Sequence, residues 1–257
     1  MSRETALITG ASSGIGSELA KLFAADGSSL VLVARREDRL QKLAQELRDE
    51  YGVAVSVLPC DLAQGYTPDR LCDQLSAHGI VVDVLVNNAG FGARGSVAGL
   101  PLERQMELVQ VNVTALTHLT RLLLPGMLER KRGGILNLSS TAGFQPGPNM
   151  SVYYASKAYV LSLTEGLAEE LSGTGVTATC LCPGPTATEF AAEAGVEGSR
   201  LFRLGAMDQA TVARAGYRGL RRGDVIVVPG VLNKAMAASV RFTPRAVVRK
   251  LVHSLQG

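Results

Sequence analysis

The residue pair most suited to acid–base chemistry in this sequence is Tyr153 and Lys157. The two lie four positions apart in a helical pattern over residues 151–171, so one helix face carries both side chains. A free tyrosine titrates near pH 10, and acid–base catalysis near neutrality requires that pKa to fall by about 2–3 units. A lysine ammonium about 4 Å away contributes on the order of 4 kcal/mol at an effective dielectric of about 20, which is enough. Because ordinary amphipathic helices show the same spacing, other motifs must decide.

A glycine-rich turn occupies residues 9–16, which read TGASSGIG and come directly after a strand-like run. Glycine lacks a Cβ atom, so the backbone can approach a ligand closely, and the helix that follows would present N–H groups to a pyrophosphate. The spacing GxxxGxG differs from the common dinucleotide pattern GxGxxG and from a nucleotide-hydrolysing P-loop. A tight turn that needs glycine is the structural alternative. The candidate cofactor-binding residues of this turn are Gly10, Ser12, Ser13, Gly14, Ile15 and Gly16.

Two arginines, Arg35 and Arg36, follow the second strand-like run, about 20 residues beyond Gly16. An acidic residue at this distance binds the ribose hydroxyl of NAD, whereas arginine suits the 2′-phosphate of NADP. Glu37 and Asp38 fall where the next helix should start, and the helix dipole explains acidic residues there. The arginines could also be solvated surface charges. Together with the glycine turn they predict NADP(H) as the cofactor, with NAD(H) less favoured.

The composition is that of a globular chain of 257 residues, 46% hydrophobic and 19% charged, which excludes general disorder. A net charge of +3 is too small and too dispersed for a nucleic-acid-binding surface, so we expect no nucleic-acid partner. Without a signal-type leader or a continuous apolar run of about 20 residues, we expect a cytoplasmic protein and no integral membrane segment. The four cysteines and three histidines lack ligand spacing, which predicts buried free thiols at Cys180 and Cys182 and no metal site.

Short apolar runs alternate with helical patterns from the first residues to about residue 228. The runs lack a clean apolar–polar alternation, which is typical of strands buried on both faces of a parallel sheet. This order predicts an α/β fold with an open, doubly wound sheet, in one domain over residues 1–257. Long helices are expected over 101–124 and 151–171, and Thr67 is the expected N-cap of a helix with Pro68 at its first position. The expected strands are 5–9, 29–34, 54–58, 82–86, 134–138, 176–182 and 225–228.

Taken together, the motifs resemble the short-chain dehydrogenase/reductase family, in its NADP-preferring branch. The resemblance covers about residues 5–190, in the family's order and spacing. It implies a Rossmann-type three-layer fold with a seven-stranded parallel sheet, an NADP(H)-dependent oxidoreductase acting on a carbonyl or secondary alcohol, and a homodimer or homotetramer. The matching motifs are the glycine turn 9–16, Asp61-Leu62, Asn87-Asn88-Ala89-Gly90, Asn112, Ser139-Ser140, Tyr153 with Lys157, and Pro183-Gly184.

The resemblance implies catalytic roles for four residues. Tyr153 would protonate the carbonyl oxygen during reduction and take the proton in the reverse direction. Lys157 would lower the pKa of Tyr153 and bind the nicotinamide ribose. Ser140, rather than Ser139, would hold the substrate oxygen. Asn112 would anchor a water chain to Lys157, although a buried amide between two valines needs a hydrogen-bond partner in any case.

The resemblance also implies the remaining cofactor contacts. Asp61 would contact the adenine, with Leu62 beside it in the same motif. Asn88 would flank the adenosine, although part of its presence could reflect turn formation. The other residues implied to contact the cofactor are Ala89 and Gly90 near the adenosine and Pro183, Gly184, Thr186 and Thr188 near the nicotinamide amide.

The region from about 186 to 222 is expected to cover the substrate. Apolar side chains among glycines fit a lid over a small, mainly apolar ketone, aldehyde or alcohol, although packing on the sheet or on another subunit explains them equally well. Phe91, Phe144 and Met150 are expected near the same cleft. The apolar lid residues are Phe190, Ala191, Ala192, Leu201, Phe202, Leu204 and Met207, and the glycines are Gly195, Gly198 and Gly205.

The sequence pattern of the C-terminal region, about 231–257, predicts two helices. Val247, Val248, Leu251 and Leu255 repeat as a core stripe on the second helix, which favours packing. An extension of the substrate site, a subunit contact and a membrane surface are the alternatives for this region.

Two other classes of function compete with an enzyme. A regulator that binds NADPH without turnover would keep the glycine turn but would not need Ser140, Tyr153 and Lys157 together. An interaction scaffold would leave the whole cleft unexplained. The joint presence of the three side chains therefore favours an enzyme.

Overall fold

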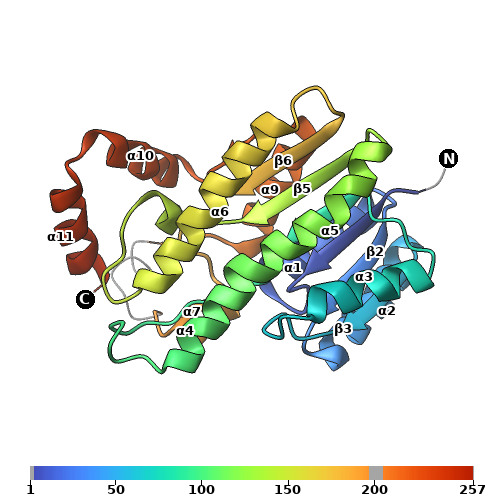
Figure 1. The fold of residues 1–257 in the computed structure, drawn as a ribbon, viewed down its shortest axis with the longest axis horizontal. Coiled ribbons are helices and arrows are strands. Elements are labelled where there is room, and N and C mark those ends of the chain that lie inside the picture. The colour runs from blue at the N-terminus through green and yellow to red at the C-terminus, as the bar shows by residue number, and fades with distance from the viewer. Residues whose placement is uncertain (1–2, 197–204, 257) are drawn as a thin grey trace.

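The computed structural model describes residues 3–196 and 205–256, and it contains a seven-stranded sheet in the order β3-β2-β1-β4-β5-β6-β7 (Figure 1). Every neighbouring pair of strands in the sheet is parallel. This is the doubly wound Rossmann-type architecture that the sequence predicts. The strands are β1 (Thr5–Thr9), β2 (Ser29–Ala34), β3 (Val55–Pro59), β4 (Val84–Asn87), β5 (Gly133–Leu138), β6 (Val176–Leu181) and β7 (Ile226–Val227).

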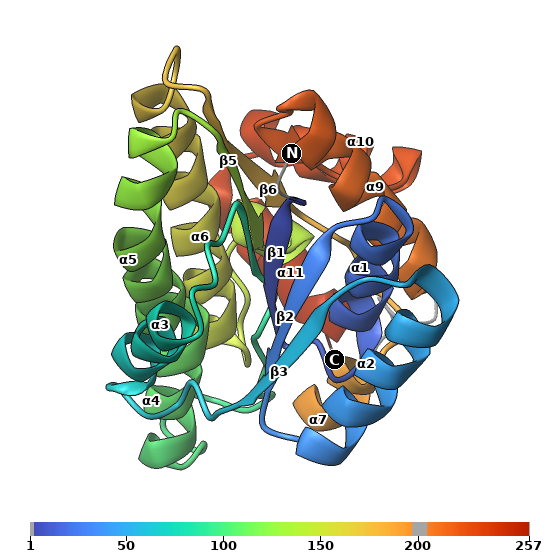
Figure 2. The same cartoon turned by 90° about the vertical axis from the view of Figure 1, so that its right-hand side faces the viewer.

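Helices cover both faces of this sheet (Figure 2). The longest, α6, crosses one face together with α5, while α1 and α9 pack against each other on the opposite face. The helices over the two faces are α1 (Gly14–Ala25), α2 (Glu37–Tyr51), α3 (Thr67–Ala77), α4 (Leu102–Val109), α5 (Leu116–Glu129), α6 (Ser151–Glu170) and α9 (Gln209–Arg222).

The strand side chains divide between two hydrophobic cores, one on each face of the sheet. In β1, Ala6 and Ile8 belong to the core under α1, α2 and α9, whereas Leu7 belongs to the core under α3 and α5. Both faces are therefore dry, and a strand buried on both sides is apolar at every position. This explains why the sequence shows short apolar runs instead of alternation.

A buried polar ladder fixes the middle of the sheet against two helices. Asn87 at the end of β4 donates from Nδ2 to Asn137 Oδ1 on β5 (2.9 Å) and to Thr120 Oγ1 on α5 (3.1 Å). Asn137 in turn donates to Thr164 Oγ1 on α6 at 3.0 Å. Buried amides must be partnered, so this ladder specifies how β4, β5, α5 and α6 sit together.

The predicted element boundaries differ from the observed ones at two places that matter. The helix expected over 101–124 is three segments: α4, a π-helical segment η1 (Gln110–Ala115) and α5, which continues through Pro125 to Glu129. The expected N-cap Thr67 is instead inside α3, and its hydroxyl donates to the carbonyl of Asp61 at 2.7 Å. β1 and β2 have the predicted bounds, and the ends of the other five strands differ from prediction by at most two residues.

The remaining elements follow strands β5, β6 and β7. They are the 3₁₀ segment η2 (Thr141–Phe144), the helices α7 (Glu189–Ala194) and α10 (Val231–Ser239), the 3₁₀ segment η3 (Val240–Phe242) and α11 (Arg245–Gln256). Figure 1 shows α10 and α11 at one end of the molecule, beyond the sheet. Among the described residues, none of the helices has the length and apolar character needed to cross a membrane.

The expected core stripe of α11 is only partly right. Val248 and Val252 are buried, but Val247 and Leu251 are more than half exposed. The buried face of α11 therefore passes through Val248 and Val252, one position along from the predicted Val247 and Leu251. The side chain of Leu255 lies outside the described part of the chain.

Candidate active site

A cleft of about 540 Å³ opens at the carboxyl ends of the strands. Residues directly after β1, β4, β5 and β6 line it, and α6 and α7 add further side chains. The strand order reverses between β1 and β4, the place where open α/β sheets bind ligands. The cleft therefore brings together every motif that the sequence singled out except Asn112, which lies behind its wall.

The glycine turn forms the floor of one end of this cleft. Gly10 has φ +65° and Gly14 has φ +63°, a left-handed conformation that favours glycine. A Cβ atom on Gly16 would collide with the Gly10 carbonyl and with Asn88 Nδ2. Asn88 fixes the turn by donating from Nδ2 to the carbonyls of Thr9 (2.8 Å) and Gly10 (3.1 Å). Its side chain thus acts on the turn itself as well as lining the cleft.

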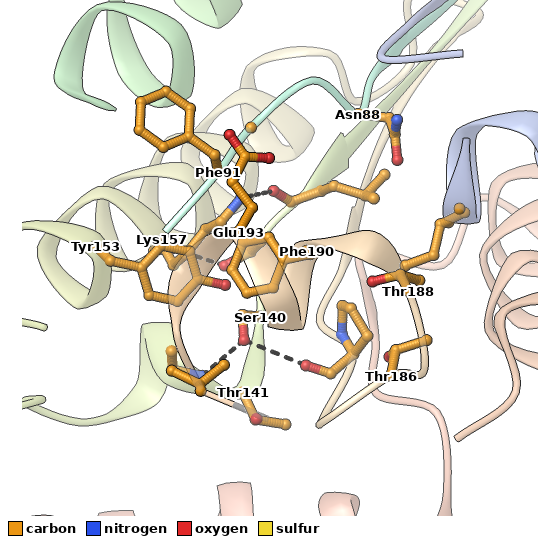
Figure 3. Close-up of a pocket in the computed structure, with 18 of the residues that line it drawn as sticks. Asn88, Phe91, Ser140, Thr141, Tyr153, Lys157, Thr186, Thr188, Phe190 and Glu193 are labelled. Carbon is orange, nitrogen blue, oxygen red and sulfur yellow. Dashed lines mark hydrogen bonds between the residues drawn. The ribbon is translucent and has the colours of Figure 1, made fainter. Parts of the chain in front are cut away.

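The side chains of Ser139 and Ser140 have different hydrogen-bond partners. Ser139 is buried and donates its hydroxyl to the Lys157 carbonyl at 2.7 Å. Ser140 Oγ accepts from Ala142 N at 3.1 Å and donates to the Pro183 carbonyl at 3.3 Å. In Figure 3 the side chains of Ser140, Tyr153 and Lys157 extend into one part of the cleft. The structure therefore places Ser140 with the acid–base pair and leaves Ser139 a packing role.

Tyr153 is 8% exposed and lies under the ring of Phe190, with the two ring centroids 5.4 Å apart. Burial raises the pKa of Tyr153 above its usual value, and a hydrogen bond with Ser140 opposes this rise. The sequence led us to expect a pKa lowered by Lys157. In this structure burial outweighs every favourable contact, so the phenol keeps its proton.

Lys157 is buried at the same place, one helical turn along α6. Its Nζ donates to the Leu138 carbonyl at 2.8 Å and lies 5.8 Å from the centroid of the Tyr153 ring. Burial lowers the pKa of Lys157 to about 8, because a buried ammonium loses its hydration. The lysine is thus charged at neutral pH and close to the phenol, as the spacing of four residues predicts.

Asn112 lies in the π-helical segment η1 and is fully buried. Its amide donates to the Phe91 carbonyl (3.0 Å) and to Ser156 Oγ (3.1 Å), and its Oδ1 accepts from Phe91 N (3.1 Å). A Cβ atom built on Gly90 would lie 2.9 Å from Asn112 Oδ1 and 3.4 Å from Lys157 Nζ. Asn112 therefore holds the loop after β4 against the lysine, and π-helical turns often mark functional positions.

The two arginines after β2 point to different places. Arg36 turns onto the glycine loop, where its Nη2 donates to Ser12 Oγ (3.0 Å) and Ser13 Oγ (2.8 Å). Arg35 is more exposed and lies 3.8 Å from Glu107. Both line the cleft, but Arg36 is the one joined to the turn.

Sequence reasoning missed the ion pairs of Glu189 with Arg36 and Arg39. Glu189 on α7 accepts from Arg36 Nη1 at 2.8 Å and from Arg39 Nη1 at 2.5 Å. These two guanidinium groups lower the pKa of Glu189 to about 2. The sequence offered one signal of a shared acidic partner: Arg36 and Arg39 lie three residues apart at the start of α2. Glu189 itself is 153 residues away from Arg36 and gave no signal.

A family model of short chain dehydrogenases matches residues 4–197. The chain belongs to the short-chain dehydrogenase family. A short chain dehydrogenase of Pseudocercospora fijiensis is 39% identical over 191 residues, which are 74% of this chain and 62% of that relative. The chain thus covers less than two thirds of this relative's length.

Three solved structures of short-chain dehydrogenases or alcohol dehydrogenases are similar along nearly the whole chain. One from Sphingobium yanoikuyae, in complex with NADPH, is 35% identical with a TM-score of 0.82 and covers 95% of this chain and 97% of its own. A bulky-bulky ketone specific alcohol dehydrogenase from Comamonas testosteroni is 31% identical with a TM-score of 0.79, covering 96% and 97%. One from Burkholderia phymatum, in complex with NAD, is 30% identical with a TM-score of 0.81, covering 93% and 92%.

The short-chain dehydrogenase fold binds a nicotinamide cofactor, and the residues of this cleft fit one. The side chain of Ser13 makes no capping hydrogen bond to the first turn of α1, so N–H groups are left for a ligand phosphate. At the adenosine end, Asp61, Leu62, Ala89 and Gly90 line the cleft, and Asp61 also accepts from Ala63 N at 3.0 Å.

The segment after β6 lines the other end of this short-chain dehydrogenase's cleft, with Pro183, Gly184, Thr186 and Thr188. A Cβ atom on Gly184 would collide with the side chain of Asn233 from α10. Thr186 donates its hydroxyl back to the Gly184 carbonyl at 2.9 Å. The predicted cofactor-binding residues other than Gly16 therefore border one cleft, and their contacts with a cofactor are a proposal.

The part of the cleft next to Tyr153 is mainly apolar, although the carboxylate of Glu193 also borders it (Figure 3). Phe91, Met150 and Phe190 line it as expected, whereas Phe144 packs on the core around Val160 instead. Of the expected lid, Gly198, Leu201, Phe202 and Leu204 lie outside the described residues. The C-terminal region, for which an extension of the substrate site was one alternative, also lines the cleft, with Met236, Ala237, Val240, Val248, Leu251 and Val252.

Proposed function

We propose that this chain is an NADP(H)-dependent oxidoreductase that transfers a hydride between the nicotinamide and a carbonyl or secondary alcohol carbon. When bound, the cofactor supplies or accepts the hydride. The observation that carries the proposal is the convergence of Ser140, Tyr153 and Lys157 in a cleft whose other end is the glycine turn. This arrangement combines a proton donor with a cofactor site in one cavity.

In the reduction direction the chain's own residues supply the proton. Tyr153 Oη transfers its proton to the carbonyl oxygen as that oxygen becomes a hydroxyl, and Ser140 Oγ hydrogen-bonds the same oxygen. Tyr153 is then a phenolate, which the nearby Lys157 ammonium stabilises. At neutral pH Tyr153 holds the proton that this step transfers, as a phenol with an ordinary pKa near 10 already does. Asn112 is a positioning residue that holds the loop of Gly90 beside Lys157.

The preference for NADP(H) over NAD(H) is supported by Arg36. Its guanidinium lies on Ser12 and Ser13, which gives a phosphate one planar donor group and two hydroxyls. The NADPH bound to the Sphingobium yanoikuyae protein is compatible with this preference, although the Burkholderia phymatum protein was solved with NAD. The arrangement around Arg36 is therefore the main support.

The proposed substrate is a small, mainly apolar ketone or aldehyde, or the matching alcohol. Aromatic and aliphatic side chains surround the space next to Tyr153, and the ring of Phe190 covers the phenol. Such walls favour apolar groups on either side of a carbonyl. The bulky-bulky ketone specific protein from Comamonas testosteroni is similar over 96% of the chain, which supports a ketone but not the small size of the substrate.

We also propose a cytoplasmic location and a homo-oligomer of single-domain subunits. The location is supported by four free cysteines, which suit a reducing compartment. The oligomer rests on the family resemblance.

The test is turnover of a panel of ketones and aldehydes with NADPH, comparing the parent with Tyr153→Phe. We expect a loss of about 10²–10⁴-fold in turnover, since the proton donor is removed while the ring remains. Tyr159→Phe is the matched control: it lies on the same helix, is 39% exposed and hydrogen-bonds Thr117 away from the cleft. Undiminished turnover in Tyr153→Phe would reject the mechanism, and NADPH binding by the parent without any turnover would favour a regulator.

A further inference from the structure

The C-terminal helix pair, defined as α10, η3 and α11 (residues 231–256), has an unusual charge. From residue 225 to the end, the chain has five basic residues and no Asp or Glu. Residues 1–224 contain the other 21 Lys and Arg against all 23 Asp and Glu, a net charge of −2. The positive charge of the protein is thus concentrated in its last 33 residues. The five basic residues, all exposed, are Lys234, Arg241, Arg245, Arg249 and Lys250.

The same helix pair exposes large apolar side chains. Val231 is 88% exposed and Phe242, in the turn between the two helices, is 87% exposed. Leu232, Val247 and Leu251 are also more than half exposed. Exposed apolar side chains gathered on one element, beside charged ones, mark an interaction surface. This segment also lies beyond residues 4–197, the part matched by the family model.

Some of the exposed apolar side chains of the helix pair also line the cleft. Met236 on α10 and Leu251 on α11 line the cleft and are 40% and 56% exposed. Val248 and Val252, on the adjoining face of α11, line it too and are buried. Figure 1 shows both helices at the outer end of the molecule. The mouth of the cleft on this side is therefore bordered by the apolar and basic helix pair.

We propose that the C-terminal helix pair docks on an anionic lipid surface. Basic side chains pair with lipid phosphates while apolar ones enter the acyl boundary, so a lipid surface accommodates both features together. A two-fold contact with a second copy would instead place the same five basic residues against themselves. Docking would hold the Leu251 side of the cleft next to the lipid, where apolar substrates concentrate.

The test is co-sedimentation of the full chain with vesicles of phosphatidylcholine alone or mixed with phosphatidylglycerol. We expect binding to the anionic vesicles only, weakening as salt rises. Arg245→Gln with Arg249→Gln should weaken binding about 30-fold, since each basic group near such a surface contributes about fivefold. Phe242→Ser should weaken it about tenfold by removing an inserted ring.

Matched controls lie elsewhere on the surface. Leu102→Ser removes an apolar side chain on α4 that is 66% exposed, and Arg121→Gln with Arg218→Gln removes two exposed charges. These variants should bind vesicles like the parent. Turnover of a water-soluble ketone, measured on the same preparations, reports the proposed catalytic function separately from lipid binding.

Three results would overturn the proposal. The first is no binding of the parent to anionic vesicles at low salt. The second is a loss in the control variants equal to that in the helix-pair variants. The third is a charge effect without any effect of Phe242→Ser, which would show that the vesicle surface only attracts the basic residues and that no apolar side chain enters the acyl boundary. A parent that fails to bind vesicles, and whose subunit number changes in Phe242→Ser, would instead place this surface in a subunit contact.

Discussion

Tyr153 and Lys157 are both buried, and burial moves their pKa values in opposite directions. A neutral phenol and a neutral amine are each favoured by a dry site, so the tyrosine stays protonated while the lysine pKa approaches physiological pH. The neutral phenol suits reduction, where a proton is given. Oxidation of an alcohol needs the phenolate, which the Lys157 ammonium would have to stabilise.

The lowered pKa of Lys157, about 8 against 10.5 for a free lysine, makes a prediction about stability. Between these values the unfolded chain binds a proton at this lysine that the native chain does not, so stability rises with pH. Below pH 8 the cost of the buried ammonium is fully present. We expect the free energy of unfolding of the parent, relative to Lys157→Met, to rise by about 2–3 kcal/mol from pH 7.5 to 10.

Urea unfolding of both proteins across this pH range measures the difference. Lys42→Met, at an exposed position on α2, corrects for the loss of one positive charge. A parent-minus-variant difference that stays flat or falls with pH would show that the Lys157 ammonium is solvated in the native protein.

At the scale of elements, α7 is tied to the start of α2 by the ion pairs of Glu189 with Arg36 and Arg39. All three side chains are two-fifths or more exposed, so each pair contributes at most about 1 kcal/mol. The carboxylate nevertheless occupies guanidinium donors that a 2′-phosphate would use. The proposed phosphate role of Arg36 therefore links cofactor binding to the placement of α7.

The arginines give a prediction about cofactor choice. Arg36→Asp should weaken NADPH binding at least tenfold more than NADH binding, because it removes phosphate donors and adds a like charge. Arg35→Asp, one residue away but directed toward Glu107, should change this ratio less. Glu189→Gln should raise NADPH affinity about two- to fivefold by freeing the donors of Arg36 and Arg39.

Titration of each variant with NADPH and NADH, followed by cofactor fluorescence, measures these ratios. Equal losses for the two cofactors in Arg36→Asp would refute the phosphate role. A Glu189→Gln protein with weaker NADPH binding would show that the carboxylate supports the site instead of competing within it.

Across the whole molecule, local signals and long-range contacts contributed differently to what the sequence could predict. The sheet was predictable because strands buried on both faces are apolar throughout, and the glycine turn because its backbone requires glycine at Gly10 and Gly14. The π-helical segment was not, since its apolar pattern barely departs from that of an α-helix. The burial of Tyr153 under Phe190 and the pairing of Arg36 with Glu189 join distant segments, so neither left a local signal.

The C-terminal wall of the cleft leads to a prediction about substrate size. Leu251 lines the cleft from α11, at the end of the chain farthest from the glycine turn in sequence, and is 56% exposed. A bulky ketone reaching this wall would cover Leu251, whereas a small one next to Tyr153 would not. Truncating the side chain should therefore raise KM for bulky ketones with little change in kcat.

We expect Leu251→Ala to lower kcat/KM about fivefold for a diaryl ketone and less than twofold for acetone. The half-exposed leucine would contribute roughly half of its apolar burial free energy to binding the large ketone and almost none to binding the small one. Val247→Ala is the matched control: it lies one turn earlier on α11, is similarly exposed, and is not among the lining residues. Steady-state kinetics of the three proteins without lipid decide the matter. Equal effects on both ketones, or an equal effect of Val247→Ala, would show that α11 does not form a wall of the substrate site.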